Sequence, residues 1–212
     1  MKDLRPCRNC LLSIGYCLLM KTCYRVNEIF YSLQGEGFHT GRAAIFVRFS
    51  GCNLRCPFCD TDFSSYQEMT GEEIIRAISD YPGRFVVLTG GEPTLQVDDA
   101  LIDLLHRNGY MVAMETNGTH PWPVSLDWST VSPKEKVVVT KCNELKVVFQ
   151  QQPEEEIEQL MKQIQADHYF LQPCDTGDAE KNRVIVAACV DYIKAHPRWR
   201  LSLQTHKITD IK

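Results

Sequence analysis

The segment Ser50-Gly-Cys-Asn-Leu-Arg-Cys-Pro-Phe-Cys-Asp-Thr-Asp-Phe63 places three cysteines in a polar, turn-forming loop directly after an apolar run. Three residues separate Cys52 from Cys56, and two separate Cys56 from Cys59, so the three thiolates can bind one metal centre. A structural zinc site takes four protein ligands, and an electron-transfer iron–sulfur cluster usually takes four cysteines. Three ligands therefore predict a [4Fe–4S] cluster that leaves one iron open for a substrate or cosubstrate.

Two other interpretations compete with this cluster. One is a zinc site whose fourth ligand is a distant cysteine, such as Cys142 or Cys174. The other is three unrelated buried thiols. A free cysteine normally takes the place of a small apolar residue, whereas the residues around these three are polar. Metal analysis distinguishes the first two interpretations, because the cluster contains iron and sulfide whereas the other site contains zinc.

Composition is typical of a soluble globular protein. The 212 residues suffice for one domain with a sizeable core, and 44% are hydrophobic and 24% charged. The formal net charge is −4 without a basic block, which argues against nucleic acid as a direct partner. No apolar run is long enough to span a bilayer, so we expect no membrane association. Reduced thiols and an oxygen-sensitive cluster both indicate a cytoplasmic location.

Residues 1–23 differ from the rest of the chain and contain an apolar run and four of the ten cysteines, Cys7, Cys10, Cys17 and Cys23. A basic start and a short apolar stretch are typical of a signal peptide, but no small-x-small cleavage site follows. We expect a poorly ordered extension, with Met20 as the natural start. A second metal site on Cys7 and Cys10 is the alternative. The functional domain is then 24–212.

Strands and helices alternate along this domain. Patterns of apolar residues predict strands over 24–30, 43–49, 84–89, 110–116, 127–131, 143–149, 168–171 and 199–204, and helices over 70–80, 98–108, 153–165 and 179–195. Such alternation implies an α/β fold with mostly parallel strands. A full eight-fold barrel takes about 250 residues, so we expect a partial, open TIM-like barrel. Polar segments follow the strands, at the edge where parallel sheets bind ligands.

Two features beside the cysteine loop suggest ligand contacts. Arg48 interrupts the apolar strand 43–49 and needs an anionic partner. That partner is either a protein carboxylate in a salt bridge or the carboxylate of a substrate. The turn Leu33-Gln-Gly-Glu-Gly37 has two glycines around a carboxylate, which allows close approach to a ligand, although a plain glycine turn has the same appearance.

From residue 24 onward the chain resembles the 7-carboxy-7-deazaguanine synthase family of radical S-adenosylmethionine (SAM) enzymes in queuosine biosynthesis. The cysteine motif and Thr89-Gly-Gly-Glu-Pro93 resemble motifs of the radical SAM superfamily. This resemblance also implies the partial barrel of that superfamily. The more specific matches are Asn27-Glu-Ile-Phe30, Leu33-Gln-Gly-Glu-Gly37, Arg48, Cys59-Asp-Thr61, Glu115-Thr-Asn-Gly118, Ser132-Pro-Lys134 and Gln172-Pro173. The first 20 or so residues lie outside the resemblance.

The resemblance implies three cofactors and a set of site residues. Cys52, Cys56 and Cys59 would bind the [4Fe–4S] cluster, and Thr61 would bind Mg²⁺, although a helix or turn cap explains Thr61 equally simply. SAM would contact Phe58, Cys59, Asp60, Gly90, Gly91, Glu92, Ser132, Pro133, Lys134, Gln172, Pro173, Cys174 and Asp175. The pterin substrate would contact Leu33, Gln34, Gly35, Glu36, Arg48, Thr89 and His206. The alternative for His206 is that it is a solvent-exposed residue of the C-terminal tail without a role in binding.

The family's reaction converts 6-carboxy-5,6,7,8-tetrahydropterin to 7-carboxy-7-deazaguanine, with ring contraction and loss of ammonia. The resemblance further implies a homodimer and a reductant such as flavodoxin or ferredoxin. The nearest alternative is another radical SAM enzyme, such as a glycyl-radical activating enzyme, which acts on a protein and needs neither Arg48 nor the Gln34–Glu36 turn. A zinc-stabilised binding module without catalysis is the alternative from another class.

Overall fold

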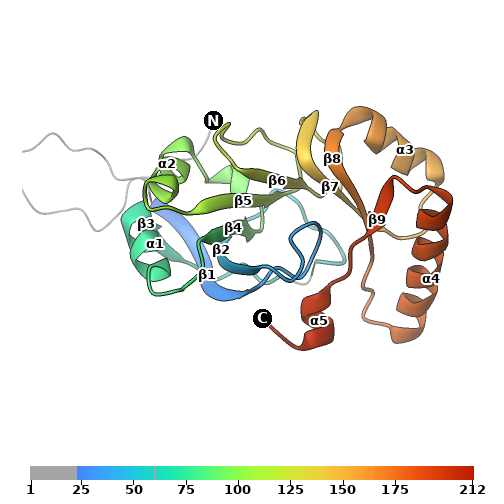
Figure 1. Cartoon of the computed structure of the whole chain (residues 1–212), viewed down its shortest axis with the longest axis horizontal. Coiled ribbons are helices and arrows are strands. Elements are labelled where there is room, and N and C mark those ends of the chain that lie inside the picture. The colour runs from blue at the N-terminus through green and yellow to red at the C-terminus, as the bar shows by residue number, and fades with distance from the viewer. Residues whose placement is uncertain (1–22, 60) are drawn as a thin grey trace, which may run out of the picture.

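The computed structural model describes residues 23–59 and 61–212, and within them one mixed sheet of nine strands runs through the molecule (Figure 1). The strands are β1 (Cys23–Leu33), β2 (Ala43–Phe49), β3 (Gln67–Thr70), β4 (Phe85–Gly90), β5 (Met111–Thr116), β6 (Trp128–Val131), β7 (Lys141–Phe149), β8 (Gln165–Pro173) and β9 (Trp199–Leu201). The helices are α1 (Gly71–Ile78), α2 (Asp99–Arg107), α3 (Glu154–Gln163), α4 (Ala179–Ala195) and α5 (Thr205–Thr209), with a 3₁₀ turn at Pro93–Leu95.

The sheet is mostly parallel and does not close. Its order is β3-β1-β2-β4-β5-β6-β7-β8-β9, so β3 and β9 are the two edges. Every neighbouring pair from β2 to β9 is parallel, whereas β1 pairs antiparallel with both β2 and β3. The expected partial barrel is therefore confirmed, with an antiparallel extension at one edge.

Side chains on alternate strand positions divide between two faces, as the pleat requires. On β2, Ile45 and Val47 belong to a core cluster that includes α1 and α2 residues, whereas Ala44 and Phe46 belong to a smaller cluster on the other face. A third cluster joins β7 and β8 to α3 and α4. Figure 1 shows α1 and α2 near the β3 end of the sheet and α3 and α4 near the β9 end.

The helices begin where local sequence favours them. Thr70 and Glu73 form a capping box at α1, in which the threonine side chain accepts from the Glu73 backbone and Glu73 accepts from the Thr70 backbone. Asp98 caps α2 and Asp178 caps α4, because each side chain accepts hydrogen bonds from backbone N–H groups of the first helical turn. Helix α4 has the predicted bounds.

Several elements differ from the expected ones. Strand β1 runs on to Leu33, because antiparallel pairing with β2 supports it along its length. Strand β9 ends at Leu201 rather than at 204, and α5 follows it. Strand β3 has the sequence Gln-Glu-Met-Thr, which shows no apolar alternation, and pairing with β1 alone defines it.

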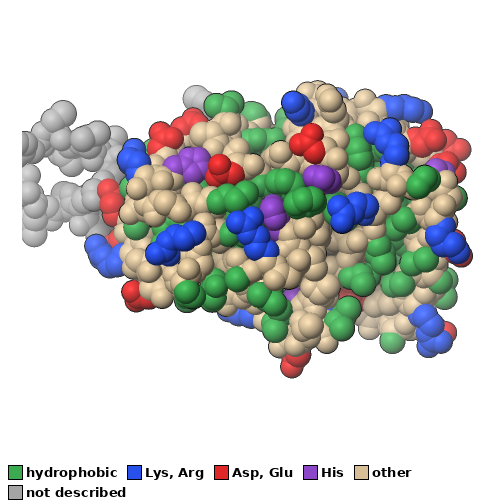
Figure 2. Space-filling model, in the orientation of Figure 1, with side chains coloured by type: hydrophobic (Ala, Val, Ile, Leu, Met, Phe, Trp, Pro, Cys, Tyr) green, Lys and Arg blue, Asp and Glu red, His purple; other side chains and the backbone are tan. Residues whose placement is uncertain are grey.

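The predicted extension, its proposed disorder and the possible metal site on Cys7 and Cys10 fall outside the described residues, except that Cys23 begins β1. In the described part of the chain, none of the helices has the length and apolarity needed to cross a membrane. Basic and acidic side chains both occur across the face drawn in Figure 2, so that face carries charges of mixed sign.

Candidate active site

Two adjoining cavities lie at the C-terminal edge of the parallel strands, as the polar segments after the strands predicted. The larger cavity has a volume of about 630 Å³ and the smaller one about 230 Å³. Both are lined by Glu36, Thr61, Thr89, Gly90, Glu115 and Gln204. These shared residues form the junction between the cavities, so ligands in the two would lie next to each other.

The three loop cysteines line the larger cavity as free thiols. The Cys59 N–H donates to the Cys56 carbonyl at 3.1 Å and the Leu54 N–H donates to Cys52 Sγ at 3.4 Å, which fixes the loop locally. Burial raises the pKa of Cys52 and of Cys56. A bound metal reverses this effect, because coordination favours the thiolate.

The donor set fits an iron–sulfur cluster better than a single ion. Among the described residues, no three His, Cys, Asp or Glu side chains gather around a point where one metal ion would bind. A cluster spreads its thiolate ligands over separate irons, so the three sulfurs need not meet at one point. Cys142, one candidate for a fourth zinc ligand, is buried in the core between β7 and the α3–α4 helices, away from the loop.

The end of β4 packs directly against the cysteine loop. Gly91 N–H donates to the Phe49 carbonyl at 3.1 Å and Glu92 N–H donates to the Gly51 carbonyl at 2.9 Å. A Cβ on Gly91 would come within 2.1 Å of the Gly51 oxygen, and Gly90 has a φ of +131°. Side chains are therefore excluded at both positions by backbone contact and conformation.

Glu92 does not line either cavity. It is 0% exposed, and its carboxylate accepts from Thr94 N–H at 3.0 Å, Thr94 Oγ1 at 2.6 Å, Thr116 Oγ1 at 2.7 Å and Asn117 N–H at 2.7 Å. Its side chain thus joins the ends of β4 and β5, and the SAM contact that the resemblance implied for Glu92 stays a prediction.

Replacing Glu92 with glutamine is expected to lower the free energy of unfolding by about 2–4 kcal/mol, because one acceptor oxygen becomes a donor that faces other donors. Chemical denaturation under anaerobic conditions measures this loss. The same substitution at exposed Glu68 on β3 is the control and should change stability little. A Glu92→Gln variant as stable as the Glu68→Gln variant would contradict the role given to this carboxylate.

The other residues predicted for SAM divide by position. The larger cavity is lined by Phe58, Cys59, Gly90, Gly91, Ser132, Lys134, Gln172, Pro173, Cys174 and Asp175. Pro133 is buried outside both cavities, and Asp60 falls outside the described residues. Lys134 Nζ donates to the Ser132 carbonyl at 3.1 Å and lies 6.0 Å from the Phe58 ring centre. Burial lowers the pKa of Lys134 to about 8.

All seven residues predicted for the pterin, Leu33, Gln34, Gly35, Glu36, Arg48, Thr89 and His206, line the smaller cavity. Helix α5 brings His206 there, since Thr205 N–H and Oγ1 donate to the Gly35 carbonyl at 3.0 and 2.9 Å. His206 packs so closely that a Cβ on Gly35 would come within 2.5 Å of its Nδ1. His206 is therefore part of the site wall rather than a solvated tail.

Arg48 forms the salt bridge that its sequence position suggested, and it also lines the smaller cavity. Its Nε donates to Glu28 Oε1 at 2.8 Å, and Lys212 Nζ donates to Glu28 Oε2 at 2.6 Å. Burial opposes the ionisation of Glu28, but the hydrogen bonds from Lys212 and Arg48 outweigh it and lower the pKa of Glu28. Two cations against one carboxylate leave excess positive charge, and both Arg48 and Lys212 line the smaller cavity.

Several residues at this site were not assigned from the sequence: Glu28, Glu115, Glu144, Lys146, Gln204 and Lys212. Lys146 interrupts the apolar strand β7 just as Arg48 interrupts β2, and that interruption was the available signal. Glu115 appears in a quoted motif. Gln204 and Lys212 lie near the C-terminus, where neither composition nor periodicity marks a ligand contact.

Comparisons with known proteins agree with this geometry. The structure matches a solved one titled "Crystal structure of QueE from Escherichia coli" with a TM-score of 0.73 and 29% identity, covering 85% of this chain and 93% of the other. The family model described as the Radical SAM superfamily matches residues 46–128. The open parallel sheet and the three-cysteine loop at its C-terminal edge thus define a radical SAM enzyme.

Curated relatives identify the family within the radical SAM class. The 7-carboxy-7-deazaguanine synthase of Bacteroides thetaiotaomicron is 53% identical over 190 residues, covering 89% of this chain and 98% of the relative. The enzyme of that name from Bradyrhizobium diazoefficiens is 42% identical over 216 residues, covering 89% and 99%. The chain belongs to the 7-carboxy-7-deazaguanine synthase family. Membership implies a [4Fe–4S] cluster and SAM as cofactors.

Proposed function

We propose that this enzyme converts 6-carboxy-5,6,7,8-tetrahydropterin to 7-carboxy-7-deazaguanine, with ring contraction and loss of ammonia, in the biosynthesis of queuosine and related 7-deazapurines. The observation that carries the proposal is the pair of adjoining cavities. One contains the three free cysteines, and the other contains a cationic group at Arg48 and Lys212. The residues at their junction would bring a pterin beside SAM.

In this proposal Cys52, Cys56 and Cys59 bind the cluster, and the larger cavity takes SAM. When bound and reduced, the cluster would supply the single electron that the cleavage of SAM requires. The chain itself positions the reactants. Gly90 and Gly91 keep side chains out of the space between the cysteine loop and β4. Ser132, Lys134 and Gln172–Asp175 form the opposite wall and supply polar groups for the ribose, adenine and carboxylate of SAM.

The smaller cavity fits a carboxylated pterin in charge and hydrogen-bonding capacity. Arg48 is suited to the substrate carboxylate, because a guanidinium binds carboxylates through paired donors. Gln34 and Glu36 supply an amide and a carboxylate for the polar edge of the ring. Thr89, at the end of β4, and His206, on α5, complete the wall.

The remaining parts of the proposal are a metal ion and partners. Thr61 lines both cavities and offers a hydroxyl for Mg²⁺, an ion that takes hard oxygen ligands and few of them from protein. We further propose cytoplasmic function, a homodimer, and flavodoxin or ferredoxin as the electron donor, in line with the family resemblance.

An anaerobic assay tests the proposed reaction directly. The reconstituted and reduced enzyme receives SAM, Mg²⁺ and 6-carboxytetrahydropterin, and mass spectrometry follows 7-carboxy-7-deazaguanine and 5′-deoxyadenosine. We expect product only when the reduced enzyme, SAM and the pterin are all present. Omission of Mg²⁺ is expected to lower the rate. Release of 5′-deoxyadenosine without the deazapurine would refute the substrate assignment and favour another radical SAM reaction.

A further inference from the structure

Lys146 is an unusual residue for the middle of a core strand. Its side chain is 5% exposed, and a lysine is rarely buried unless it is paired. Strand β7 alternates, so Leu145 and Val147 pack into the core beneath α3 and α4, whereas Lys146 and Val148 line the larger cavity. The strand therefore delivers one ammonium group to the side of the sheet where the ligands are expected.

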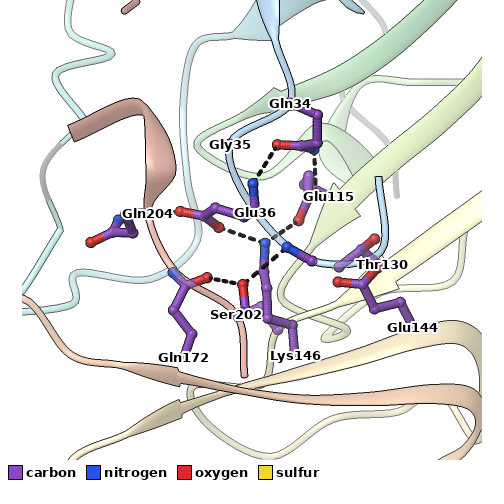
Figure 3. Close-up of polar contacts among 12 residues, drawn as sticks. Gln34, Gly35, Glu36, Glu115, Thr130, Glu144, Lys146, Gln172, Ser202 and Gln204 are labelled. Carbon is purple, nitrogen blue, oxygen red and sulfur yellow. Dashed lines mark hydrogen bonds and ion pairs between the residues drawn. The ribbon is translucent and has the colours of Figure 1, made fainter. Parts of the chain in front are cut away.

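Two carboxylates share this ammonium group (Figure 3). Lys146 Nζ donates to Glu36 Oε2 at 2.6 Å and to Glu115 Oε2 at 3.0 Å. An amide holds the second oxygen of each carboxylate: Gln204 Nε2 donates to Glu36 Oε1 and Gln34 Nε2 to Glu115 Oε1, both at 3.2 Å. These five side chains come from the 33–37 turn, β5, β7 and the segment before α5, and together they fix both carboxylates in place.

The position of the two carboxylates, Glu36 and Glu115, indicates what they bind. Glu36 and Glu115 line both cavities, so they lie at the junction where the proposed substrate meets SAM. One ammonium against two carboxylates leaves a net negative charge there. Adjacent carboxylate oxygens are acceptors only, and they match a ring edge that presents neighbouring N–H donors. The 2-amino and N3–H groups of a pterin form such an edge.

Electrostatics explain why the lysine is needed. Two carboxylates in a poorly hydrated site disfavour each other's ionised form, and one of them takes up a proton unless a cation is near. Burial opposes the charge on Lys146, but Glu115 and Glu36 outweigh it and raise its pKa. Burial likewise opposes the charge on Glu36, and Lys146 outweighs it and lowers the pKa of Glu36.

Other charged groups face this cluster. Glu144 lies two residues before Lys146 on β7 and accepts from the Phe38 N–H at 3.0 Å. Burial raises the pKa of Glu144 to about 7, against the opposing effect of Lys146. Lys134 adds positive charge from the loop after β6, and His206 faces Glu36 from α5. Neither is within hydrogen-bonding distance of Glu36 or Glu115 in the described residues, so Lys146 is the cation that contacts the pair.

We infer that Lys146 is a positioning residue. It keeps Glu36 and Glu115 both ionised and correctly oriented, so that they form an acceptor site for the N–H-bearing edge of the substrate ring. This inference rests on the proposed pterin substrate. It also assigns a selectivity: the site should favour a 2-amino-4-oxo ring over the 2,4-dioxo ring of a lumazine, whose oxygen at position 2 would face the carboxylates.

Equilibrium binding of 6-carboxypterin, the oxidised and unreactive analogue, tests the inference on the anaerobic cluster-loaded enzyme with SAM bound. Lys146→Met removes the charge at similar length. We expect its dissociation constant at pH 8 to rise roughly 10- to 100-fold, as for loss of charge-assisted hydrogen bonds. At pH 6 the loss should be larger, because without the ammonium group one carboxylate takes up a proton and then presents a donor to the N–H groups of the ring.

The control is Lys141→Met, the same substitution at an exposed position of the same strand. It should bind 6-carboxypterin like the natural enzyme at every pH. Unchanged binding by Lys146→Met would overturn the inference, and so would an equal loss at pH 6 and pH 8, because a merely structural defect has no such pH dependence. If Lys146→Met does not fold, Lys146→Arg retains the charge and should bind 6-carboxypterin like the natural enzyme at both pH values.

A measurement on the natural enzyme adds a check that needs no variant. It should bind 6-carboxypterin at least roughly tenfold more tightly than 6-carboxylumazine, and equal affinity for both would overturn the inference. The product assay separates the two proposals. Binding that follows these expectations without any deazapurine would refute the reaction alone, whereas normal product formation by Lys146→Met would refute the role of Lys146 alone.

Discussion

An enzyme in which Cys56 is replaced by alanine is expected to make no 7-carboxy-7-deazaguanine and to release no 5′-deoxyadenosine. Two cysteines are too few to hold a [4Fe–4S] cluster in this loop, and without the cluster no electron reaches SAM. Iron and sulfide analysis of the reconstituted protein, its visible absorption and the product assay measure the loss together. The effect should be complete within the detection limit rather than a reduced rate.

The matched control for Cys56→Ala is Cys142→Ala. Both substitutions remove one sulfur, but Cys142 lies in the core between β7 and the α3–α4 helices, where burial raises the pKa of its thiol to about 12 and keeps it protonated. This variant should retain iron, colour and product, with a modest loss of stability. Loss of metal from the Cys142 variant would favour the zinc site, and a full iron complement in the Cys56 variant would contradict the role of Cys56 as a cluster ligand.

The sequence predicted those parts of the fold that local pattern controls. The apolar run at 43–49 became β2 and α4 begins and ends at the predicted residues, because periodicity and caps act over a few residues. Strand β3 and helix α5 escaped prediction because distant partners define them. Strand β3 exists by pairing with β1, and α5 begins where Thr205 donates to the Gly35 carbonyl, 170 residues away.

The same distinction holds for the site. The cysteine loop is a local motif, so its residues were found together. Lys146 was visible as a charge in an apolar strand, but its partners Glu36 and Glu115 lie 110 and 31 residues away, and spacing does not reveal such a group. Glu92 shows the same limit. The resemblance implied a SAM contact, which stays a prediction, and only the structure shows that its carboxylate accepts from Thr94, Thr116 and Asn117.

Replacing Arg48 with glutamine is expected to lower kcat/KM for the pterin roughly 10- to 150-fold, which corresponds to about 1.5–3 kcal/mol for a hydrogen bond to a charged group. The loss should appear mainly in KM, because the carboxylate contact binds substrate and transition state alike. Steady-state kinetics measure this change, and an equilibrium measurement of SAM affinity should give the value of the natural enzyme.

Glu28 makes the interpretation of Arg48→Gln sharper. In the absence of substrate, Arg48 and Lys212 share its carboxylate, so a substrate carboxylate enters a group that already holds one negative charge. Arg48→Gln removes a cation from both Glu28 and the substrate carboxylate. The control, Arg76→Gln, removes the same charge from the exposed side of α1, away from either cavity. The Arg76 variant should match the natural enzyme. If Arg48→Gln lowers stability and leaves KM unchanged, Arg48 serves only the salt bridge to Glu28. If KM rises while SAM affinity holds, the arginine binds substrate and Glu28 serves to orient it.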